Sequence, residues 1–329
     1  GSSPWKWRCD STNPDDPKCL KELEGTDASE TSLERCKLTC GPSGALWPRP
    51  REVTLSNSVS YFLPANIALF ISASPDISSL LNQAFALALE SIDMYNPNYV
   101  PGEDYWTGPW DSDVEDHKLI VEVSVQSLEE FLTLDTNEMY TLAVNGNYTH
   151  TVVQITAQTF FGARHGMETF TQLIDFEEET NSLQVVNSVY ITDSPTYSYR
   201  GLTIDTSRNF IPVEDLKRTL NAMSYSKLNT LHWHITDSHS FPLNLDNLPN
   251  MAYYGAYSSS QTYSSSDVKD LILYARLRGI RILPEIDAPA QVGNGWQWGE
   301  AEGLGSLVVC FNKVSYHIKR VFICGFYVK

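Results

Sequence analysis

Charged side chains directly follow three short apolar segments in the second half of the chain. They are Asp205 and Arg208 after the first segment, Asp237 after the second, and Glu285 and Asp287 after the third. Carboxylates gathered beside a guanidinium can move protons and hold polar ligands. One carboxylate at such a position often only caps a loop, whereas three segments with the same pattern predict a site.

The elements that must position these residues are parallel strands alternating with helices. The expected order is strand 201–205, helix 212–227, strand 230–235, helix 267–278 and strand 280–285. Ser266 is the expected N-cap of the second helix. Because the carboxyl ends of parallel strands meet at one edge of a sheet, we expect the charged side chains to lie together there.

Three strings around these residues resemble the family 20 β-N-acetylhexosaminidases, the insect chitooligosaccharide-degrading type above all. They are "YRGLTIDTSRNF" from Tyr199, "LHWHITDSHSFP" from Leu231 and "ARLRGIRILPEIDAPAQVGNGW" from Ala275. The resemblance extends over nearly all of residues 1–312. It implies an α/β fold: a partial (β/α)₈ TIM barrel, preceded by an α+β domain and a Cys-rich N-terminal segment.

The resemblance also implies an activity, the hydrolysis of terminal β-linked N-acetylglucosamine or N-acetylgalactosamine with retention of configuration. Its substrates are chitooligosaccharides and glycoconjugate glycans. In this family the acetamido oxygen of the substrate attacks the anomeric carbon. A Glu protonates the leaving oxygen, and the Asp before it orients the acetamido group. No cofactor and no metal are implied.

The family's site residues are carried over one by one. Arg200 is expected to hold sugar hydroxyls, because its planar fork donates to two oxygens at once. Asp237 is expected to support the acid through an Asp–His–Glu relay. The floor of the site is expected to consist of Asp205, Arg208, Glu285 and Asp287. The alternative role for these four residues is to form structural salt bridges.

Two departures from the family pattern set the expectation for activity. The sequence has no Asp-Glu dipeptide, and Gln291 stands where the family has the relay His. Gln can hydrogen-bond but cannot carry a proton at neutral pH. We therefore expect this chain to be inactive, and the alternative function is a non-catalytic secreted protein that binds sugar or a partner.

The last 16 residues, "VSYHIKRVFICGFYVK" from Val314, depart from the family. Because a full barrel takes about 250 residues, we expect a chain truncated at its carboxyl end. Val314-Ser315 is what the splice-donor sequence GTAAGT encodes when it is read in frame. The tail is therefore interpreted either as a translated intron or as the end of a genuine short isoform.

A metal site is the alternative chemistry for the second strand. His232 and His234 alternate along it, as they do in barrel metallohydrolases, and Asp237 and His239 add further ligands. Trp233 between the two histidines, and the long family resemblance around them, favour a packed site without metal.

Four cysteines, Cys9, Cys19, Cys36 and Cys40, lie within 32 residues. Zinc would need two close pairs, and only Cys36 and Cys40 make one, so we expect two disulfides with three pairings open. Disulfides indicate an oxidising compartment, and the sequon at Asn147 predicts glycosylation there. Both favour a secreted, extracellular or lysosomal protein, and the chain begins without a signal segment, which we expect to have been removed or left out.

Composition separates the chain into parts and excludes some partners. The net charge is −17, and residues 46–195 hold 21 acidic but only 4 basic side chains. This acidity argues against nucleic acid, and no apolar run reaches the length of a membrane span. Carbohydrate is the expected partner, and the family adds a possible homodimer. The expected parts are a Cys-rich segment at 1–45, an α+β domain at 46–195, the first barrel part at 196–313 and a divergent tail at 314–329.

Within the α+β domain, patterning predicts two helices, one strand and one hairpin. The helices are expected at 79–92 and 159–174, the strand at 119–125, and the hairpin at 140–144 and 152–157. The hairpin is expected to turn at Asn145-Gly146. In the second helix Gly162, Ala163 and Gly166 are expected to allow close packing.

Overall fold

The computed structural model describes residues 5–13, 16–23, 30–103, 105–312 and 322–326. The chain divides into two compact units. The first holds residues 1–198 and 225–227, and the second holds residues 199–224 and 228–329. The expected boundary at 195/196 lies close to this division, and the Cys-rich segment belongs to the first unit. Among the described residues, no helix is long and apolar enough to cross a bilayer.

The Cys-rich segment is a β-hairpin joined to a short helix by two disulfides. Its elements are β1 (Trp5–Asp10), β2 (Lys18–Leu23) and α1 (Leu33–Thr39). Cys9 bonds to Cys40 and Cys19 bonds to Cys36, which settles the pairing that the sequence left open. The segment also joins the rest of its unit, because Ser32 Oγ donates to Glu177 Oε2 at 2.7 Å.

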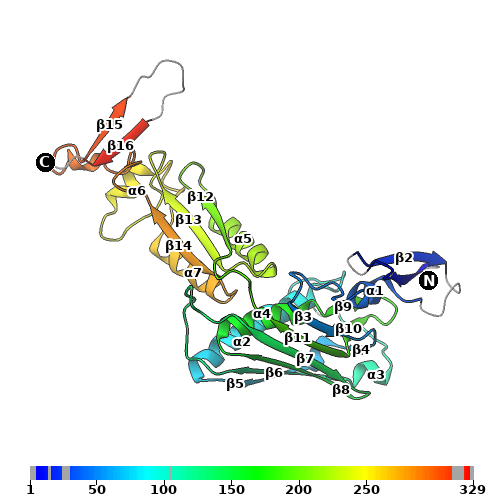
Figure 1. The fold of residues 1–329 in the computed structure, drawn as a ribbon. Coiled ribbons are helices and arrows are strands. Elements are labelled where there is room, and N and C mark those ends of the chain that lie inside the picture. The colour runs from blue at the N-terminus through cyan, green and yellow to red at the C-terminus, as the bar shows by residue number, and fades with distance from the viewer. Residues whose placement is uncertain (1–4, 14–15, 24–29, 104, 313–321, 327–329) are drawn as a thin grey trace. The chain divides into compact units, whose positions relative to one another are not determined.

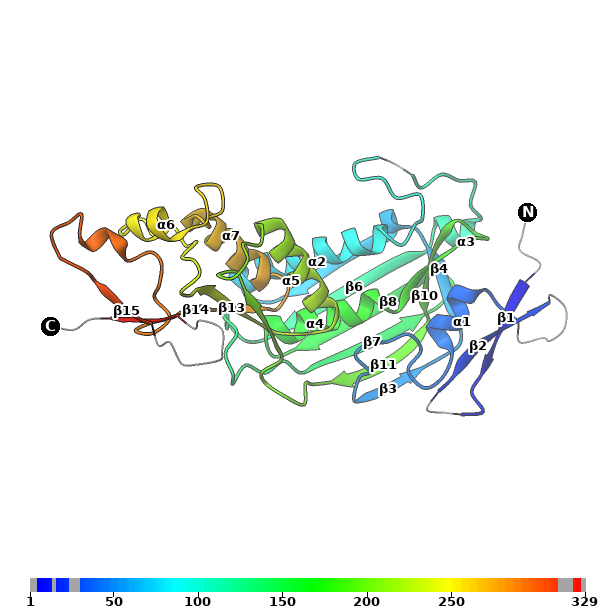
Figure 2. The ribbon, with the colours of Figure 1, turned by 90° about the horizontal axis from the view of Figure 1, so that it is seen from above.

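A six-stranded mixed sheet forms the centre of the first unit (Figures 1 and 2). In spatial order its strands are β3 (Glu52–Leu55), β11 (Ser188–Asp193), β7 (Tyr140–Gly146), β8 (His150–Ala157), β6 (Lys118–Val125) and β5 (Ile67–Ser72). A smaller sheet has the order β4 (Val59–Phe62), β10 (Ser182–Val186) and β9 (Ile174–Glu177). Two short helices complete the unit, η1 (Pro64–Asn66) and α3 (Ser112–Glu115).

Two helices, α2 (Pro75–Asp93) and α4 (Phe160–Thr171), lie on one face of the six-stranded sheet. In α4 the predicted close packing is present. A Cβ on Gly162 would lie 2.4 Å from the Met139 carbonyl oxygen, and one on Gly166 would lie 2.6 Å from Ile155 Cγ2. Glycine at these two positions therefore lets the helix approach the sheet directly.

The second unit is a three-stranded parallel sheet with the order β12, β13, β14 (Figure 1). The strands are β12 (Gly201–Asp205), β13 (Thr230–Thr236) and β14 (Arg281–Ile286). The helices are α5 (Val213–Tyr225), α6 (Asn250–Gly255), α7 (Ser265–Arg276) and η2 (Gln297–Gly299). Strand positions therefore agree with the sequence-based ones to within about one residue.

Alternation along β13 divides its side chains between two faces. Leu231 and Trp233 point into the core beside α5 and α7, and each is 1% exposed. Tyr263 stands edge-on to Trp233 with ring centroids 4.9 Å apart. His232 and His234 consequently take the opposite face, because successive strand residues point to opposite sides.

Two sequence-based details are wrong. The N-cap of α7 is Ser264, not Ser266, because Ser264 Oγ accepts from the Asp267 amide and the Asp267 carboxylate accepts from the Ser264 amide. This reciprocal capping box fixes the helix start. The hairpin turns beyond Asn145-Gly146, because β7 continues to Gly146 and the Asn147 amide donates to the His150 carbonyl at 2.9 Å.

Little of the divergent tail lies within the described residues. β15 (Val308–Asn312) pairs antiparallel with β16 (Phe322–Phe326), and residues 313–321 lie outside the described part. In this pairing Cys310 stands opposite Cys324.

The disulfide pairing gives a direct test. Peptide mapping under non-reducing conditions should recover Cys9 linked to Cys40 and Cys19 linked to Cys36. Replacing Cys19 and Cys36 together by Ser should lower the free energy of unfolding by about 2–5 kcal/mol, because the reduced chain gains conformational entropy. Urea unfolding of the variant beside the parent measures this loss. Recovery of a Cys9–Cys19 peptide would contradict the pairing.

Candidate functional site

Parallel register brings the predicted strand-end residues of the second unit together. Asp205, His234 and Glu285 stand side by side on β12, β13 and β14. Asp237 and Asp287 follow directly beyond the ends of their strands. The expectation that charged side chains meet at one edge of the sheet is therefore met for the strand-end carboxylates.

One imidazole, that of His234, connects two carboxylates, and the imidazole of His232 contacts one of them. His234 Nδ1 lies 3.1 Å from Glu285 Oε2, and its Nε2 lies 3.2 Å from Asp237 Oδ2. His232 Nε2 lies 2.5 Å from the same Glu285 oxygen. The hydrogen bond with His234 lowers the pKa of Glu285. Burial opposes charge on His234, but its bonds to Glu285 and Asp237 outweigh burial and raise its pKa.

Arg208 joins the first strand to the second. Its Nη1 contacts Asp205 Oδ2 at 2.5 Å, and its Nη2 contacts Asp237 Oδ2 at 2.7 Å. The Asp237 side chain is only 1% exposed, so its oxygens find their polar partners within the protein. Burial opposes charge on Asp205, but hydrogen bonds from the Arg208 and Ser207 amides and from the guanidinium lower its pKa.

Gln291 completes this group of side chains beside the third strand. We call the group the strand-end cluster; its members are Asp205, Arg208, His232, His234, Asp237, Glu285, Asp287 and Gln291. Its Nε2 donates to Asp287 Oδ2 at 2.9 Å, and its Oε1 accepts from Arg208 Nη2 at 3.4 Å. Burial raises the pKa of Asp287. Gln291 thus bridges a carboxylate and a guanidinium. Its neutral amide can do so because its nitrogen donates a hydrogen bond and its oxygen accepts one.

The same residues could also hold a cation. One ligand atom each from His234, Glu285 and Asp287 lies within 4.8 Å of the others. Each of these groups already has a polar partner in the cluster, and Arg208 places positive charge beside them. A metal would have to displace these contacts. The Sγ atoms of Cys19, Cys36 and Cys40 also lie close together, but disulfides occupy them.

Arg200 lies apart from this cluster along the strand direction. It directly precedes β12, and its amide donates to Asn229 Oδ1 at 3.0 Å. Asp205 stands at the other end of the strand, about 17 Å away at the usual rise per residue. The sugar-binding role of Arg200 therefore stays a prediction.

The sequence places His232 and His234 at the end of the second strand and assigns them only to the alternative metal site, with no role in the sugar site. Their side chains hold Glu285 and Asp237 in place. The signal was present in "LHWH", where apolar and imidazole side chains alternate. It could be used only with the strand register, which places His234 between Asp205 and Glu285.

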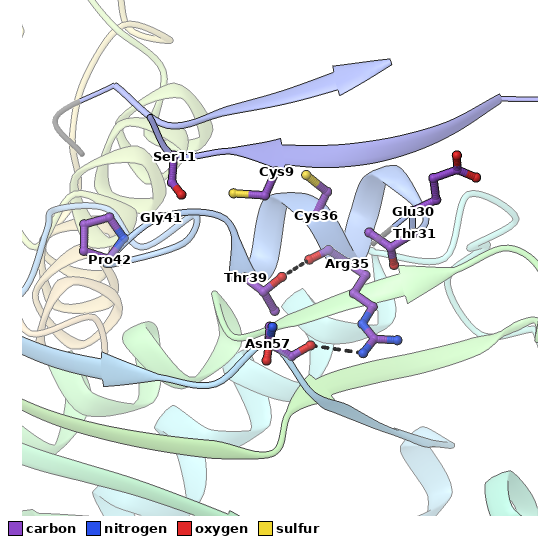
Figure 3. Close-up of a pocket in the computed structure, with 10 residues that line it drawn as sticks. All are labelled: Cys9, Ser11, Glu30, Thr31, Arg35, Cys36, Thr39, Gly41, Pro42 and Asn57. Carbon is purple, nitrogen blue, oxygen red and sulfur yellow. Dashed lines mark hydrogen bonds between the residues drawn. The ribbon is translucent and has the colours of Figure 1, made fainter. Parts of the chain in front are cut away.

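A cavity of about 770 Å³ lies in the other unit, beside the Cys-rich segment (Figure 3). Its walls include Arg35, Thr39 and Asn57. Arg35 donates to the Asn57 carbonyl at 3.0 Å, and Thr39 donates to the Arg35 carbonyl at 2.8 Å. These bonds hold the walls together, and the lining carries one carboxylate, Glu30, whereas the cluster at the strand ends brings four together. The strand-end cluster is therefore the stronger candidate for chemistry.

The cluster predicts a specific dependence of stability on pH. His234, with a raised pKa, stabilises most below about 6.5 and loses this effect as pH rises through its folded-state pKa. Glu285, with a lowered pKa, stabilises above about 4.5 and loses this effect as pH falls through its folded-state pKa. His234→Gln should therefore destabilise most between about pH 4.5 and 6.5.

Hydrogen exchange of the β13 amides across pH measures this, with His150→Gln as the control, because His150 lies on β8 of the first unit, outside the cluster. A loss of protection in His234→Gln that does not vary with pH would contradict the assignment.

Known proteins resemble this chain along most of its length. It is 33% identical over 350 residues to a probable β-hexosaminidase of Drosophila melanogaster, covering 98% of this chain and 52% of that protein. It is 37% identical over 297 residues to a chitooligosaccharidolytic β-N-acetylglucosaminidase of Bombyx mori, covering 89% and 48%. The human β-hexosaminidase subunit beta is 36% identical over 265 residues, covering 79% and 45%. The chain thus spans about half the length of these relatives.

Solved structures show the same fold. The exo-β-N-acetylglucosaminidase of Vibrio harveyi, of family 20, aligns with a TM-score of 0.58 at 24% identity, over 91% of this chain and 44% of that one. The Flavobacterium johnsoniae chitobiase aligns with a TM-score of 0.58 at 24% identity, over 75% and 35%. The three parallel strands are therefore part of a TIM-barrel catalytic domain, with a further domain before it.

Two family models match the two units separately. Residues 46–173 match the model described as beta-acetyl hexosaminidase like, and residues 197–322 match the catalytic domain of glycosyl hydrolase family 20. The second match contains every residue of the strand-end cluster. The chain belongs to glycosyl hydrolase family 20.

Proposed function

We propose that these residues are part of a β-N-acetylhexosaminidase that removes terminal β-linked N-acetylglucosamine or N-acetylgalactosamine from chitooligosaccharides and glycoconjugate glycans. The observation that carries the proposal is the strand-end cluster within the matched catalytic domain, above all the buried Asp237 held by His234 and Arg208. Relatives named for hexosaminidase and chitooligosaccharide-degrading activity support the same substrate class.

In the proposed mechanism the residues of this chain bind and orient the sugar. Arg200 donates to two hydroxyls of the terminal sugar. Asp237 supports the acid, and its contacts with Arg208 and His234 hold it in place. The acetamido oxygen of the substrate attacks the anomeric carbon, while an Asp-Glu pair orients that group and protonates the leaving oxygen.

We further propose that a polypeptide of these 329 residues alone binds sugar without hydrolysing it. Its sequence contains no Asp-Glu dipeptide to provide the acid. Gln291 bridges Asp287 and Arg208 by hydrogen bonds and cannot relay a proton. Gln291 is also the observation that favours the second candidate function, a non-catalytic protein that binds sugar or a partner.

We infer that the protein passes through an oxidising compartment, as a secreted or lysosomal protein does. Two disulfides support this. Asn147 supports it too, because its sequon lies on an exposed turn with Tyr148 99% exposed. A homodimer of the whole protein is a further proposal, which rests on the family alone.

The sugar-binding role of Arg200 can be measured directly. Arg200→Ala should raise the dissociation constant for N-acetylglucosamine by about tenfold or more, because a charged hydrogen-bond donor is lost. Arg218→Ala is the matched control, since Arg218 lies on α5 with its side chain 79% exposed. Isothermal titration gives both values. Equal affinity of the two variants would remove Arg200 from the site.

Restoring the relay residue tests the proposed lack of turnover. Gln291→His in the 329-residue polypeptide should release no product from a chromogenic N-acetylglucosaminide, because a relay is useless without its acid. General acid catalysis alone contributes about 10²–10⁴-fold. Unchanged sugar affinity shows that the variant is folded. Turnover above that of the parent would show that another group supplies the proton.

A further inference from the structure

Among the described residues, no helix covers one face of the six-stranded sheet of the first unit. Both long helices, α2 and α4, lie on the other face, where Leu119, Leu142 and Val153 are fully buried. The open face carries the alternate residues of the same strands. Its side chains fall into rows that cross the strands, because neighbouring strands pair in register.

One row has two exposed aromatic rings, on β5 and β11, and Thr54 of β3 continues the row beyond the second ring. Its members, from β5 across to β11, are Phe70, Glu122, Gln154, Ala143 and Tyr190. Phe70 is 59% exposed and Tyr190 is 55% exposed. Between them Gln154 Nε2 donates to Glu122 Oε2 at 2.9 Å. Four strand spacings separate the two rings, a distance of about 19 Å.

From β5 to β11 the next row consists of hydroxyl side chains, and on β3 it ends in Glu52, which pairs with Thr192. In the same order across the strands they are Ser72, Ser124, Thr156, Thr141 and Thr192. Within the described parts of the chain, no hydrogen bond uses these five side chains. Each hydroxyl can therefore donate one hydrogen bond and accept two. A packing surface for a helix or sheet would carry apolar side chains here, so this row fits a polar occupant.

The two rows border a groove of about 420 Å³ over β5, β6 and β8. Phe70 and Glu122 line it from the first row, and Ser72, Ser124 and Thr156 line it from the second. The groove thus has a ring face along one side and hydroxyl groups along the other. That combination suits a ligand with apolar ring faces and hydroxyl or amide edges, which is the chemistry of a sugar.

Charge narrows the class of sugar. The α+β domain at 46–195 holds 21 acidic and 4 basic side chains, and the charged group in the groove is Glu122. This field repels sulfated glycans and phosphates. An amide-bearing neutral sugar meets no such repulsion, and its N–H groups can donate to the Glu122 carboxylate.

We propose that this open face is a second carbohydrate site, which binds one neutral chain of β-linked N-acetylhexosamines laid across the strands. The chain rests on Phe70 and Tyr190 at its two ends and bonds to the hydroxyl row along its length. The ligand class follows from the proposed function, but the site needs no residue of the barrel.

The span and twist of the sheet set the form of the ligand. About 19 Å between the rings requires an oligosaccharide of several sugars, and a disaccharide reaches one ring only. The sheet twists by about 20–25° per strand, so a flat crystal face cannot touch both rings. A single soluble chain, which rotates about its linkages, can follow the twist.

The test titrates chitohexaose into the 329-residue chain that carries Arg200→Ala, so that the barrel site is weakened first. Phe70→Ala and Tyr190→Ala should each raise the dissociation constant about 2- to 12-fold, as expected for the loss of one ring contact. Thr156→Val should raise it about 2- to 12-fold through the lost hydroxyl. Tyr148→Ala is the matched control, because Tyr148 is 99% exposed and stands outside both rows.

Two results would overturn the proposal. One is chitohexaose affinity that stays the same in Phe70→Ala, Tyr190→Ala and their combination. The other is equal affinity for a sulfated glycan of similar length. Failure of the proposed hydrolase function looks different, because it would abolish the effect of Arg200→Ala and leave the effect of Phe70→Ala in place. All substituted side chains are exposed or half-buried, so unchanged thermal unfolding verifies that each variant folds.

Discussion

The contact on which the second unit depends is the bond between the Arg208 guanidinium and the buried Asp237 carboxylate. The Asp237 side chain is 1% exposed, so cations and hydrogen-bond donors of the protein must take the place of water around it. Arg208 comes from the loop after β12, and His234 comes from β13 itself, so one carboxylate links two strand ends. His234 passes the connection on to Glu285 of β14. The loops at this edge therefore hold their places through a shared set of charges.

Strand pairing in the rest of the unit positions these charged side chains. Parallel pairing places Asp205, His234 and Glu285 in one row, and the alternation of β13 buries Trp233 against the helices while it turns both imidazoles the other way. An error of one residue in register would exchange these two sets of side chains. The apolar core and the polar cluster are thus two consequences of the same pairing.

Sequence reasoning could find what depends on local pattern. Strand–helix alternation and the charged strand ends gave the parallel sheet and most of its site, because both are properties of short segments. The disulfide pairing could not be found, since three pairings of four cysteines are equal in sequence and only the position of α1 beside the hairpin separates them. The bridges made by His232 and His234 depend on strand register, and the helix start at Ser264 rather than Ser266 depends on which of several serines reaches Asp267. Each failure concerns a choice among similar residues that tertiary contacts decide.

The disulfide pairing has a consequence for biosynthesis. The pairs are nested, since Cys19–Cys36 closes inside Cys9–Cys40, with sequence separations of 17 and 31. As the chain leaves the ribosome, Cys9 and Cys19 emerge before Cys36 and Cys40, and in the folded hairpin they stand opposite each other. The first bond available to the nascent chain is therefore a wrong one. A cell that makes this protein must delay oxidation until Cys40 has emerged or reshuffle the early bond by thiol–disulfide exchange.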